Sequence, residues 1–310
     1  MHGTRILEEA DRLMTVCNSC RYCEGLCAVF PAMEMRRSFS DGDLNYLANL
    51  CHACGACYTD CQFSPPHEFN VNVPKTLAVA RVESWSAYAW PGSFSGLFAR
   101  NGLAVSIIAA LSVTAFIFGF AAFTDHQVLV GVHTGPGAFY ALMPHKAMAA
   151  LFGVAFLYAV VALGLSLRAF WHDIGEPIGM AVEAGSLWQA MKDAGRLRYL
   201  DGGGVGLLIG PAGLLAEKLK RDPAMVDETQ SGMDVAFIVM LFLTSLTGLA
   251  LLVWRDTAAM GPLLAFHLGV VFALFITLPY GKFVHGLYRY VALVRYARER
   301  RMMAQAVMTE

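Results

Sequence analysis

Eight cysteines are the residues of this sequence best suited to chemistry, and they fall into two runs with the same spacing. "CNSCRYCEGLC" covers residues 17–27 and "CHACGACYTDC" covers residues 51–61, and both read C-x2-C-x2-C-x3-C. This is the spacing of thiolates that bind cubane iron-sulfur clusters. Three thiolates at two-residue gaps on a tight loop can bind three iron corners of one cube. The sequence therefore predicts two [4Fe-4S] clusters.

The fourth cysteine of each run points away from its own loop, and in bacterial ferredoxins with two clusters it binds the other cluster. The spacing therefore predicts a crossed ligation. The first cluster takes Cys17, Cys20, Cys23 and Cys61. The second takes Cys51, Cys54, Cys57 and Cys27. The alternative is a pair of zinc sites, although zinc has no use for a third cysteine at the next two-residue gap.

Histidines near the C-terminus are a second set of candidate ligands. His267 and His285 are 18 residues apart, so one continuous helix would present both on one face, about 27 Å apart. Intramembrane histidines are candidates for axial ligands of haem b. The alternative is a helix-packing histidine at 267 and an interfacial one at 285. His145 and His172 are weaker candidates for opposite ligands, because one helix would present them on opposite faces.

The cysteines must be positioned by a small domain at the N-terminus. Residues 1–90 contain all eight and are predicted to form one cluster domain. A helix is expected within residues 36–50, with Asp41 or Asp43 as its N-cap, and an amphipathic helix is expected to lead from the second run toward the membrane. No apolar stretch near the N-terminus resembles a signal peptide, which predicts reduced cysteines in the cytoplasm.

The rest of the chain is predicted to form a bundle of about four membrane spans, so the expected fold class is mainly α. The sequence is 56% hydrophobic and only 15% charged, with a mean hydropathy of +0.50. The predicted spans are residues 102–123, 139–167, 235–254 and 261–281, each long enough to cross a hydrocarbon core of about 30 Å. Residues 204–216 are too short to cross and are expected to form a half-helix or an interfacial segment.

The distribution of basic residues orients these spans. Lysines and arginines gather before the first span, between the second and third, and after the fourth, whereas the opposite loops hold only Arg255. By the positive-inside rule, the cluster domain and both termini face the cytoplasm from a bacterial inner membrane. The expected domains are the cluster domain (1–90), a membrane hairpin (91–170), a cytoplasmic connector with a short apolar segment (171–230), a second hairpin (231–286) and a basic tail (287–310).

Other function classes find little support in the residues. The net charge of -1 gives no reason to expect nucleic acid, and a basic tail directly after a span is typical of an anchor on anionic lipid headgroups. No dinucleotide loop, nucleophile elbow or carboxylate pair indicates bond-making catalysis, so substrate chemistry is expected on a partner. A helix at 183–200 is expected to pack against the cluster domain or to dock that partner. Its predicted apolar side consists of Leu187, Met191, Ala194 and Leu197.

Several motifs together resemble the tricarballylate-utilisation protein B / citrate-utilisation protein family. They are the two cysteine runs, "QFSPPHEFNVNVP", "FWHDIGEP", "GRLRYLDGGG" and "LPYGKFVHGLYR". The resemblance implies a membrane-bound protein that reoxidises a flavin-dependent tricarballylate dehydrogenase and passes the electrons toward the quinone pool. The last helix is also similar to a haem-bearing helix of the respiratory nitrate reductase gamma subunit, which carries two histidines at this separation.

One stretch departs from that family. Its members continue after the segment that matches "LDGGG" into a further hydrophobic hairpin with histidines, whereas here Gly204 leads directly into "VGLLIGPAGLLA". If those histidines pair with His267 and His285, this chain is expected to bind haem poorly or not at all. Two other function classes stay open, namely a heterodisulfide-reductase-like subunit with its own substrate site and a zinc-binding membrane adaptor.

Overall fold

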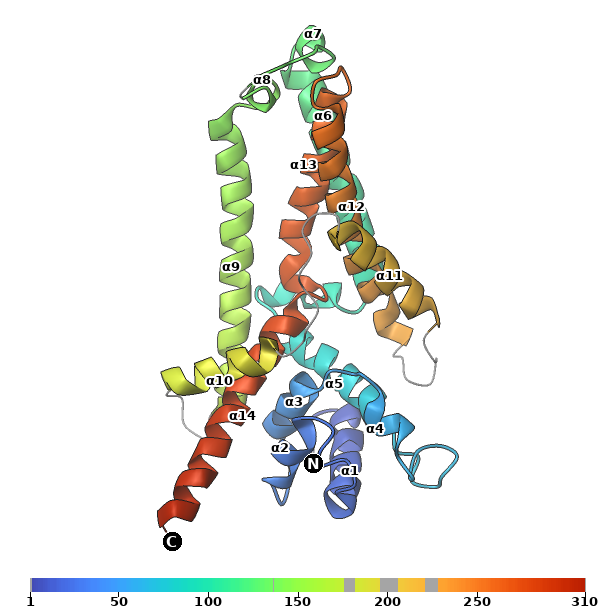
Figure 1. Cartoon of the computed structure of the whole chain (residues 1–310), viewed down its shortest axis with the longest axis vertical. Coiled ribbons are helices and arrows are strands. Elements are labelled where there is room, and N and C mark those ends of the chain that lie inside the picture. The colour runs from blue at the N-terminus through green and yellow to red at the C-terminus, as the bar shows by residue number, and fades with distance from the viewer. Residues whose placement is uncertain (1, 136, 176–181, 196–205, 221–227, 310) are drawn as a thin grey trace.

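The computed structural model describes residues 2–135, 137–175, 182–195, 206–220 and 228–309, and every regular element in these ranges is a helix. Figure 1 shows long helices at one end of the molecule and a group of short helices at the other. The C-terminal helix passes from the first group to the second. The mainly α fold class predicted from the sequence is thereby confirmed.

The group of short helices holds both cysteine runs. It consists of α1 (Arg5–Cys20), α2 (Val29–Glu34), α3 (Asp41–Leu50), α4 (Ala56–Thr59) and α5 (Val73–Tyr88). Its core lies between α1, α3 and α5, where apolar residues at helical spacing meet. The boundary predicted near residue 90 stays a prediction.

The helix predicted within residues 36–50 is confirmed as α3, but its N-cap is Ser40 rather than Asp41 or Asp43. Ser40 has an extended backbone, as an N-cap requires, and its hydroxyl accepts a hydrogen bond from the Asp43 N–H at 3.2 Å. Asp43 lies inside the first turn, and its carboxylate accepts a hydrogen bond from the Ser40 N–H. The two residues form a capping box, which leaves one oxygen of Asp43 for other partners.

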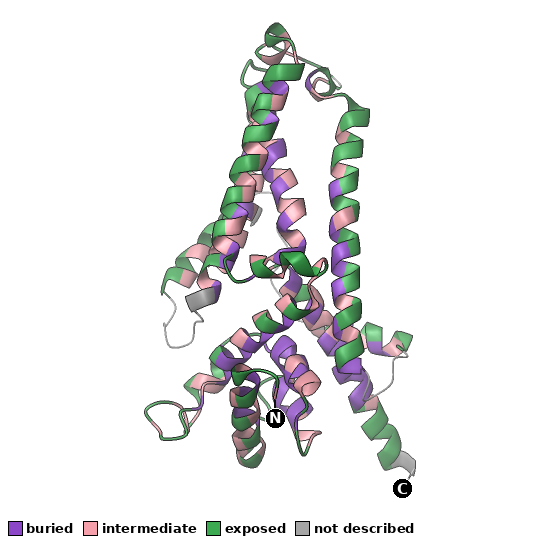
Figure 2. Cartoon of the chain, turned by 180° about the vertical axis from the view of Figure 1, so that it is seen from behind, coloured by how far each residue is buried: buried purple, intermediate pink, exposed green. Residues whose placement is uncertain are grey.

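Within the described ranges, four helices are long and apolar enough to cross a membrane, which is the number predicted. The first three are α6 (Asn101–Phe123), α9 (His145–Gly175) and α12 (Glu228–Trp254), and the fourth begins with α13 (Met260–Thr277). Much of their surface is exposed, as expected for helices that face lipid (Figure 2). The short helices α7 (His126–Leu129) and α8 (Phe139–Leu142) connect α6 to α9.

The last span does not continue as one helix. After α13, a short 3-10 helix, η4 (Leu278–Tyr280), changes the direction of the chain, and α14 (Val284–Thr309) begins only four residues later. Pro279 lies at this break. Proline lacks a backbone hydrogen-bond donor and clashes with the preceding turn, so it favours the interruption of the helix here. Tyr280 anchors the break by donating a hydrogen bond to the Trp90 carbonyl at 2.9 Å, next to the 3-10 helix η1 (Gly92–Leu97).

Helix α14 lies on the cluster domain rather than along the membrane surface. Its basic residues were expected to contact lipid headgroups, but Arg295 and Arg298 are buried in the protein. The C-terminal end of α9 joins this contact, because the rings of Phe170 and Tyr288 lie 4.9 Å apart. The core of the cluster domain therefore includes residues from both ends of the chain.

Helix α10 (Ala184–Gly195) packs against α14 with a face other than the predicted one. Ser186 and Ala190 are fully buried, whereas Leu187 and Met191 are 39% and 52% exposed. The small side chains allow the helices to approach closely, and the Tyr290 hydroxyl donates a hydrogen bond to the Leu187 carbonyl at 3.3 Å. Leu187 and Met191 therefore do not form the side that packs on α14, and the alternative that their apolar side docks a partner stays a prediction. The side chains of Ala194 and Leu197 lie outside the described residues.

Helix α11 (Gly206–Lys220) contains most of the predicted short apolar segment and lies against α12 (Figure 1). It has 15 residues with Pro211 inside, and it is not one of the four helices that are able to cross a membrane. Its last turn carries Lys218 and Lys220. These lysines line a hollow together with Asp234, so the polar end of α11 lies beside the first turns of α12.

The contact between α6 and α13 depends on Gly269. A Cβ atom at this position would lie 2.5 Å from the Val113 Cα, so a side chain would force the two backbones apart. We expect Gly269→Ala to lower the free energy of unfolding by about 1 to 3 kcal/mol, the usual cost of overpacking. Thermal unfolding in detergent measures this effect. Gly119→Ala on α6, where a Cβ would meet no atom within 4 Å, is the matched control and should leave the melting temperature unchanged.

Candidate metal centres

The first cysteine run wraps around the end of α1. Cys17 and Cys20 lie on the last turn of this helix, and Arg21 ends it in the left-handed conformation, with φ of 55°. This turns the chain back on itself, so that Cys23 follows in a tight turn. Cys27 lies just before α2, whose first N–H groups, from Val29 and Phe30, hydrogen-bond to its sulfur.

The second run uses the same kind of turn. Cys51 ends α3, and the next turn has two residues with left-handed backbones, Ala53 with φ of 53° and Gly55 with φ of 85°. Only glycine adopts such a conformation without steric cost, so Gly55 suits its position and Ala53 is strained. The Ala53 N–H donates a hydrogen bond to the Cys51 sulfur at 3.3 Å. The chain then enters α4 with Cys57 and leaves it toward Cys61.

The eight cysteines line two hollows, and each hollow receives three cysteines from one run and the last cysteine of the other. The first hollow contains Cys17, Cys20, Cys23 and Cys61. The second contains Cys27, Cys51, Cys54 and Cys57. Phe30, which is buried, lines both and forms the wall between them. These are the two groups that crossed ligation requires.

The electrostatics of the thiols follow the same grouping. Burial and repulsion by the neighbouring thiolates of Cys61, Cys23 and Cys20 together raise the pKa of the Cys17 thiol to about 12. Partial desolvation, with contributions from Cys51 and Cys54, raises the pKa of Cys27 to about 11, although this residue is exposed at the surface. Buried neutral thiols become ligands only by losing their protons to a bound metal, whose charge replaces the proton.

These donor sets fit a cubane cluster. Among the residues that the structure describes, no three histidine, cysteine or acidic side chains converge closely enough to hold a single metal ion. The thiols are instead distributed around a hollow, and a [4Fe-4S] cube needs this arrangement because each corner iron takes one thiolate. The walls are mainly apolar, although Cys27 and Cys54 of the second hollow are exposed. Such walls and the N–H groups directed at sulfur are features that set cluster potentials.

A buried arginine joins the second hollow to the C-terminal helix. Arg81 on α5 is 1% exposed and donates a hydrogen bond to the Cys51 carbonyl at 2.7 Å. The same nitrogen lies 3.4 Å from both ring nitrogens of His285, in the first turn of α14. The rings of His52 and Trp85 lie 6.2 and 5.8 Å from that of His285. Burial and the charges of Arg289 and Arg81 lower the pKa of His52 to about 4, so His52 is neutral at pH 7.

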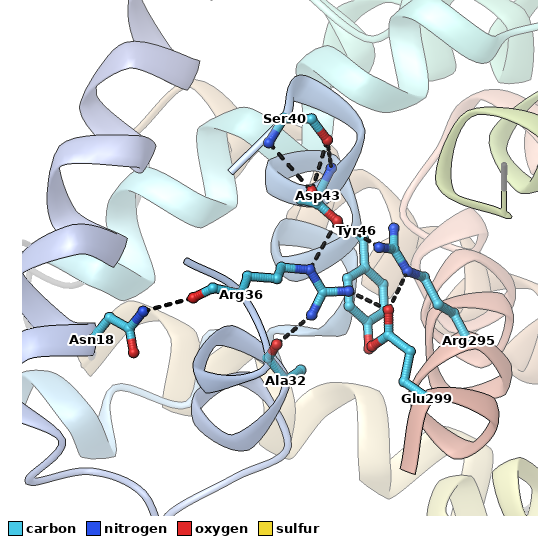
Figure 3. Close-up of polar contacts among 8 residues, drawn as sticks. All are labelled: Asn18, Ala32, Arg36, Ser40, Asp43, Tyr46, Arg295 and Glu299. Carbon is cyan, nitrogen blue, oxygen red and sulfur yellow. Dashed lines mark hydrogen bonds and ion pairs between the residues drawn. The ribbon is translucent and has the colours of Figure 1, made fainter. Parts of the chain in front are cut away.

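A network of charged side chains holds α14 on the cluster domain (Figure 3). Arg36 donates a hydrogen bond to Asp43 at 2.8 Å and also pairs with Glu299, while Arg295 pairs with both Asp43 and Glu299. The four charges balance, and all four side chains are at most 14% exposed. Tyr46 lies beneath the two guanidinium groups, 4.9 Å from that of Arg36 and 4.2 Å from that of Arg295.

The four candidate histidines lie in different environments. His267 on α13 is hydrogen-bonded through Nδ1 to the Thr247 hydroxyl at 2.7 Å. His285 lies on α14, so the expectation that both share one face of a continuous helix was wrong, because the helix breaks at Pro279. His145 begins α9 at the opposite end of the bundle, and His172 lies in its last turn. Their predicted roles as haem ligands stay predictions.

Sequence reasoning missed the residues that connect the two parts of the molecule. Arg81 stands alone among apolar residues in "LAVARVESW", which is the pattern of a buried cation with a specific partner. Arg295 and Glu299 are four residues apart, which is the spacing of an ion pair on one helix face. This spacing could have been recognised in the sequence, although the tail was interpreted only as basic.

The fold and these hollows define a membrane protein with a ferredoxin-like cysteine domain. The family described as "Citrate utilization protein B Fer4-like domain" matches residues 10–87, and the family described as "Citrate utilization protein B" matches residues 96–206 and 202–306. The chain therefore belongs to the citrate utilization protein B family. It is similar to a protein named "Citrate utilization protein B" from Escherichia coli, with 39% identity and with coverage of 96% of this chain and 94% of that protein. No solved structure matches the chain.

The similarity is interrupted in the middle of the chain. The second family description matches two segments that meet at residues 202–206. The alignment with the E. coli protein extends over 364 positions, although 96% of this chain is only about 298 residues. This chain therefore lacks a segment that the relative has, which supports the departure noted in the sequence after "LDGGG".

Proposed function

We propose that this protein transfers electrons from a flavoprotein dehydrogenase to quinone through two [4Fe-4S] clusters. The observation that carries this proposal is the division of eight cysteines into two hollows of four, with one cysteine exchanged between the runs. When bound, the clusters supply one-electron transfer. The partner is a dehydrogenase of tricarballylate or a related tricarboxylate, as the resemblance implies, and the name of the E. coli relative supports this class of substrate.

The two hollows suggest an order for the transfer. The first is flanked by exposed aromatic residues, with Tyr22 70% and Phe69 42% exposed, which suits docking of a partner protein. The second is joined through Arg81 to α14 and hence to the membrane bundle. Electrons would therefore enter at the first set of cysteines and leave at the second. Bacterial inner-membrane localisation, with the cluster domain and termini in the cytoplasm, follows from the distribution of basic residues.

Haem b is a weaker candidate for the exit cofactor. His267 and His285 lie on different helices. The Arg81 guanidinium lies 3.4 Å from both ring nitrogens of His285, whereas His267 hydrogen-bonds to Thr247 through Nδ1 and keeps Nε2 available. The residues present therefore do not fit a haem held by this pair, and no electron-transfer step is assigned to it. Transfer from the second cluster directly to quinone accounts for the function without haem.

Anaerobic purification followed by iron analysis and optical and EPR spectra tests the proposal. We expect about eight irons per chain, broad absorption from thiolate-ligated iron and an EPR signal after reduction, because two cubes carry four irons each. A colourless protein that contains zinc and gives no EPR signal would favour the membrane adaptor and would refute electron transfer. Turnover of a disulfide substrate without any flavoprotein would favour the heterodisulfide-reductase-like class.

A further inference from the structure

Two adjoining hollows lie where the membrane bundle meets the cluster domain. The smaller, of about 120 Å³, lies between α6, α12 and the end of α13, and its lining is mainly apolar. The larger, of about 420 Å³, lies between α11 and α12 and is lined by several charged residues. Phe237 and Lys282 line both. Lys282 follows η4, so its ammonium group lies at the boundary between the apolar hollow and the charged one.

The charged groups at this boundary do not balance. Lys282 lies 2.8 Å from one oxygen of Asp234, and Lys218 pairs with the other oxygen. The three side chains are only 14 to 26% exposed. Glu217 and Lys220 line the same hollow, so three lysines face two carboxylates there and one positive charge is left uncompensated. A partly buried positive charge favours an electron-rich oxygen atom as a ligand, because desolvation strengthens the attraction.

Arg81 connects this boundary to the second set of cysteines. Its guanidinium group donates a hydrogen bond to the Cys51 carbonyl, and the carboxylate of Asp234 lies close enough to influence it electrostatically. One buried side chain therefore contacts the Cys51 backbone and also feels the charge of Asp234, which lines the larger hollow.

We propose that these two hollows form the site at which quinone is reduced, which deepens the proposed function and rests on it. The quinone ring occupies the smaller hollow, with one carbonyl oxygen directed at Lys282 and the isoprenoid tail in the lipid. A flat ring with an apolar tail and two carbonyl oxygens matches an apolar hollow that ends at a buried ammonium group. An anionic lipid headgroup would satisfy the charge alone and would use only the larger, more open hollow.

The reaction balances with the groups at hand. Reduction of quinone to quinol needs two electrons and two protons, and both carbonyl oxygens become hydroxyl groups. The two electrons come from the reduced clusters, one from each. Lys282 donates a proton to the nearer carbonyl oxygen of the quinone. Asp234 and Lys218 hold the Lys282 side chain in position, and they pass a proton from the aqueous side to reprotonate Lys282. The second proton comes from water that reaches the larger hollow.

Photolabelling tests where the quinone binds. Purified iron-loaded protein is irradiated with an arylazido derivative of a short-chain ubiquinone, and the labelled peptides are identified by mass spectrometry. We expect label on the peptides around Phe237 and Lys282, and excess decylubiquinone should prevent it. Label confined to another part of the bundle would overturn the assignment, as would label that cardiolipin displaces and decylubiquinone does not.

Kinetics of variants test the role of Lys282. Dithionite-reduced protein is mixed anaerobically with decylubiquinone, and reoxidation of the clusters is followed optically. We expect Lys282→Met to slow reoxidation on the order of a hundred-fold, the usual effect of losing a general acid, while iron content and EPR spectra stay unchanged. Lys282→Arg, which keeps the charge, should retain part of the rate. Lys146→Met, at the opposite end of the bundle, is the matched control and should react as the wild type does.

The outcomes separate this site from the proposed function. If wild-type protein carries no iron or does not react with decylubiquinone, the electron-transfer function itself fails. If wild-type protein reacts and Lys282→Met reacts equally fast, the function stands and the site assignment fails. If Lys282→Met loses its iron, its slow reaction says nothing about Lys282, and photolabelling of the wild-type protein decides the site assignment.

Discussion

Replacement of Cys27 by alanine is expected to destroy the cluster whose other ligands are Cys51, Cys54 and Cys57 and to leave the other cluster in place. The reason is geometric, because the Cys27 side chain lines the hollow of the second run although it belongs to the first. Iron content should fall from about eight to about four per chain, since each cube holds four irons. Electron transfer should cease, because the remaining cluster has no route to the membrane.

Pairs of substitutions test the crossed ligation by iron content alone, so no EPR signal has to be assigned to either cluster. Cys27→Ala combined with Cys54→Ala should lose no more iron than either variant alone, because both residues belong to one cluster. Cys27→Ala combined with Cys20→Ala should lose nearly all iron. The reverse pattern would show that each run holds its own cluster. Cys61→Ala is the reciprocal control and should behave as Cys20→Ala does.

The second large effect is expected at the charged network of Figure 3. Arg295→Met removes one of two arginines that neutralise Asp43 and Glu299, and Arg295 is only 1% exposed. Loss of one partner from a buried ionic group costs about 3 to 5 kcal/mol, because the remaining charge stays desolvated. Thermal unfolding in detergent should show this loss. Arg300→Met, exposed on the same helix, is the control and should change stability by less than about 0.5 kcal/mol.

The same network predicts how stability depends on pH. Burial alone would raise the pKa of Asp43, but hydrogen bonds from Arg36 and Ser40 and the charges of Arg36 and Arg295 lower it from 3.8 to about 2. A carboxyl group whose pKa is lowered by folding stabilises the fold at every pH above its pKa in the unfolded chain. For Asp43 this contribution is about 2 kcal/mol, and it is lost as the pH falls from about 4 to 2. In Asp43→Asn the acid-side slope should be smaller. An unchanged slope would exclude Asp43 as its source.

The main lines of the fold were predictable from the sequence because they depend on local spacing and composition. The distribution of the eight cysteines between two hollows follows the C-x2-C-x2-C-x3-C spacing, and the four long helices follow from uninterrupted apolar stretches. A helix within residues 36–50 was also predicted, although its cap was placed at Asp41 or Asp43, since serine and aspartate are both good N-cap residues.

What the sequence did not predict depends on contacts between distant residues. Arg36 and Glu299 are separated by 263 positions, and no local pattern relates them. His285 was assigned to the membrane because the helix was assumed to continue past Pro279, and the direction of the chain after that break is set by tertiary packing. The packed face of α10 was misjudged for a similar reason. Its small residues, Ser186 and Ala190, face α14, although hydrophobicity alone favoured Leu187.

The position of α14 on the cluster domain has a consequence for how the protein is made. The cysteines leave the ribosome before α14, which carries Arg295 and Glu299 and follows the membrane helices in the chain. The domain core includes Tyr288, Ala292 and Leu293, so it stays incomplete until α14 has been synthesised and the membrane helices before it have been inserted. Iron delivery is therefore expected after membrane insertion, and the N-terminal region expressed alone should be an unstable fragment.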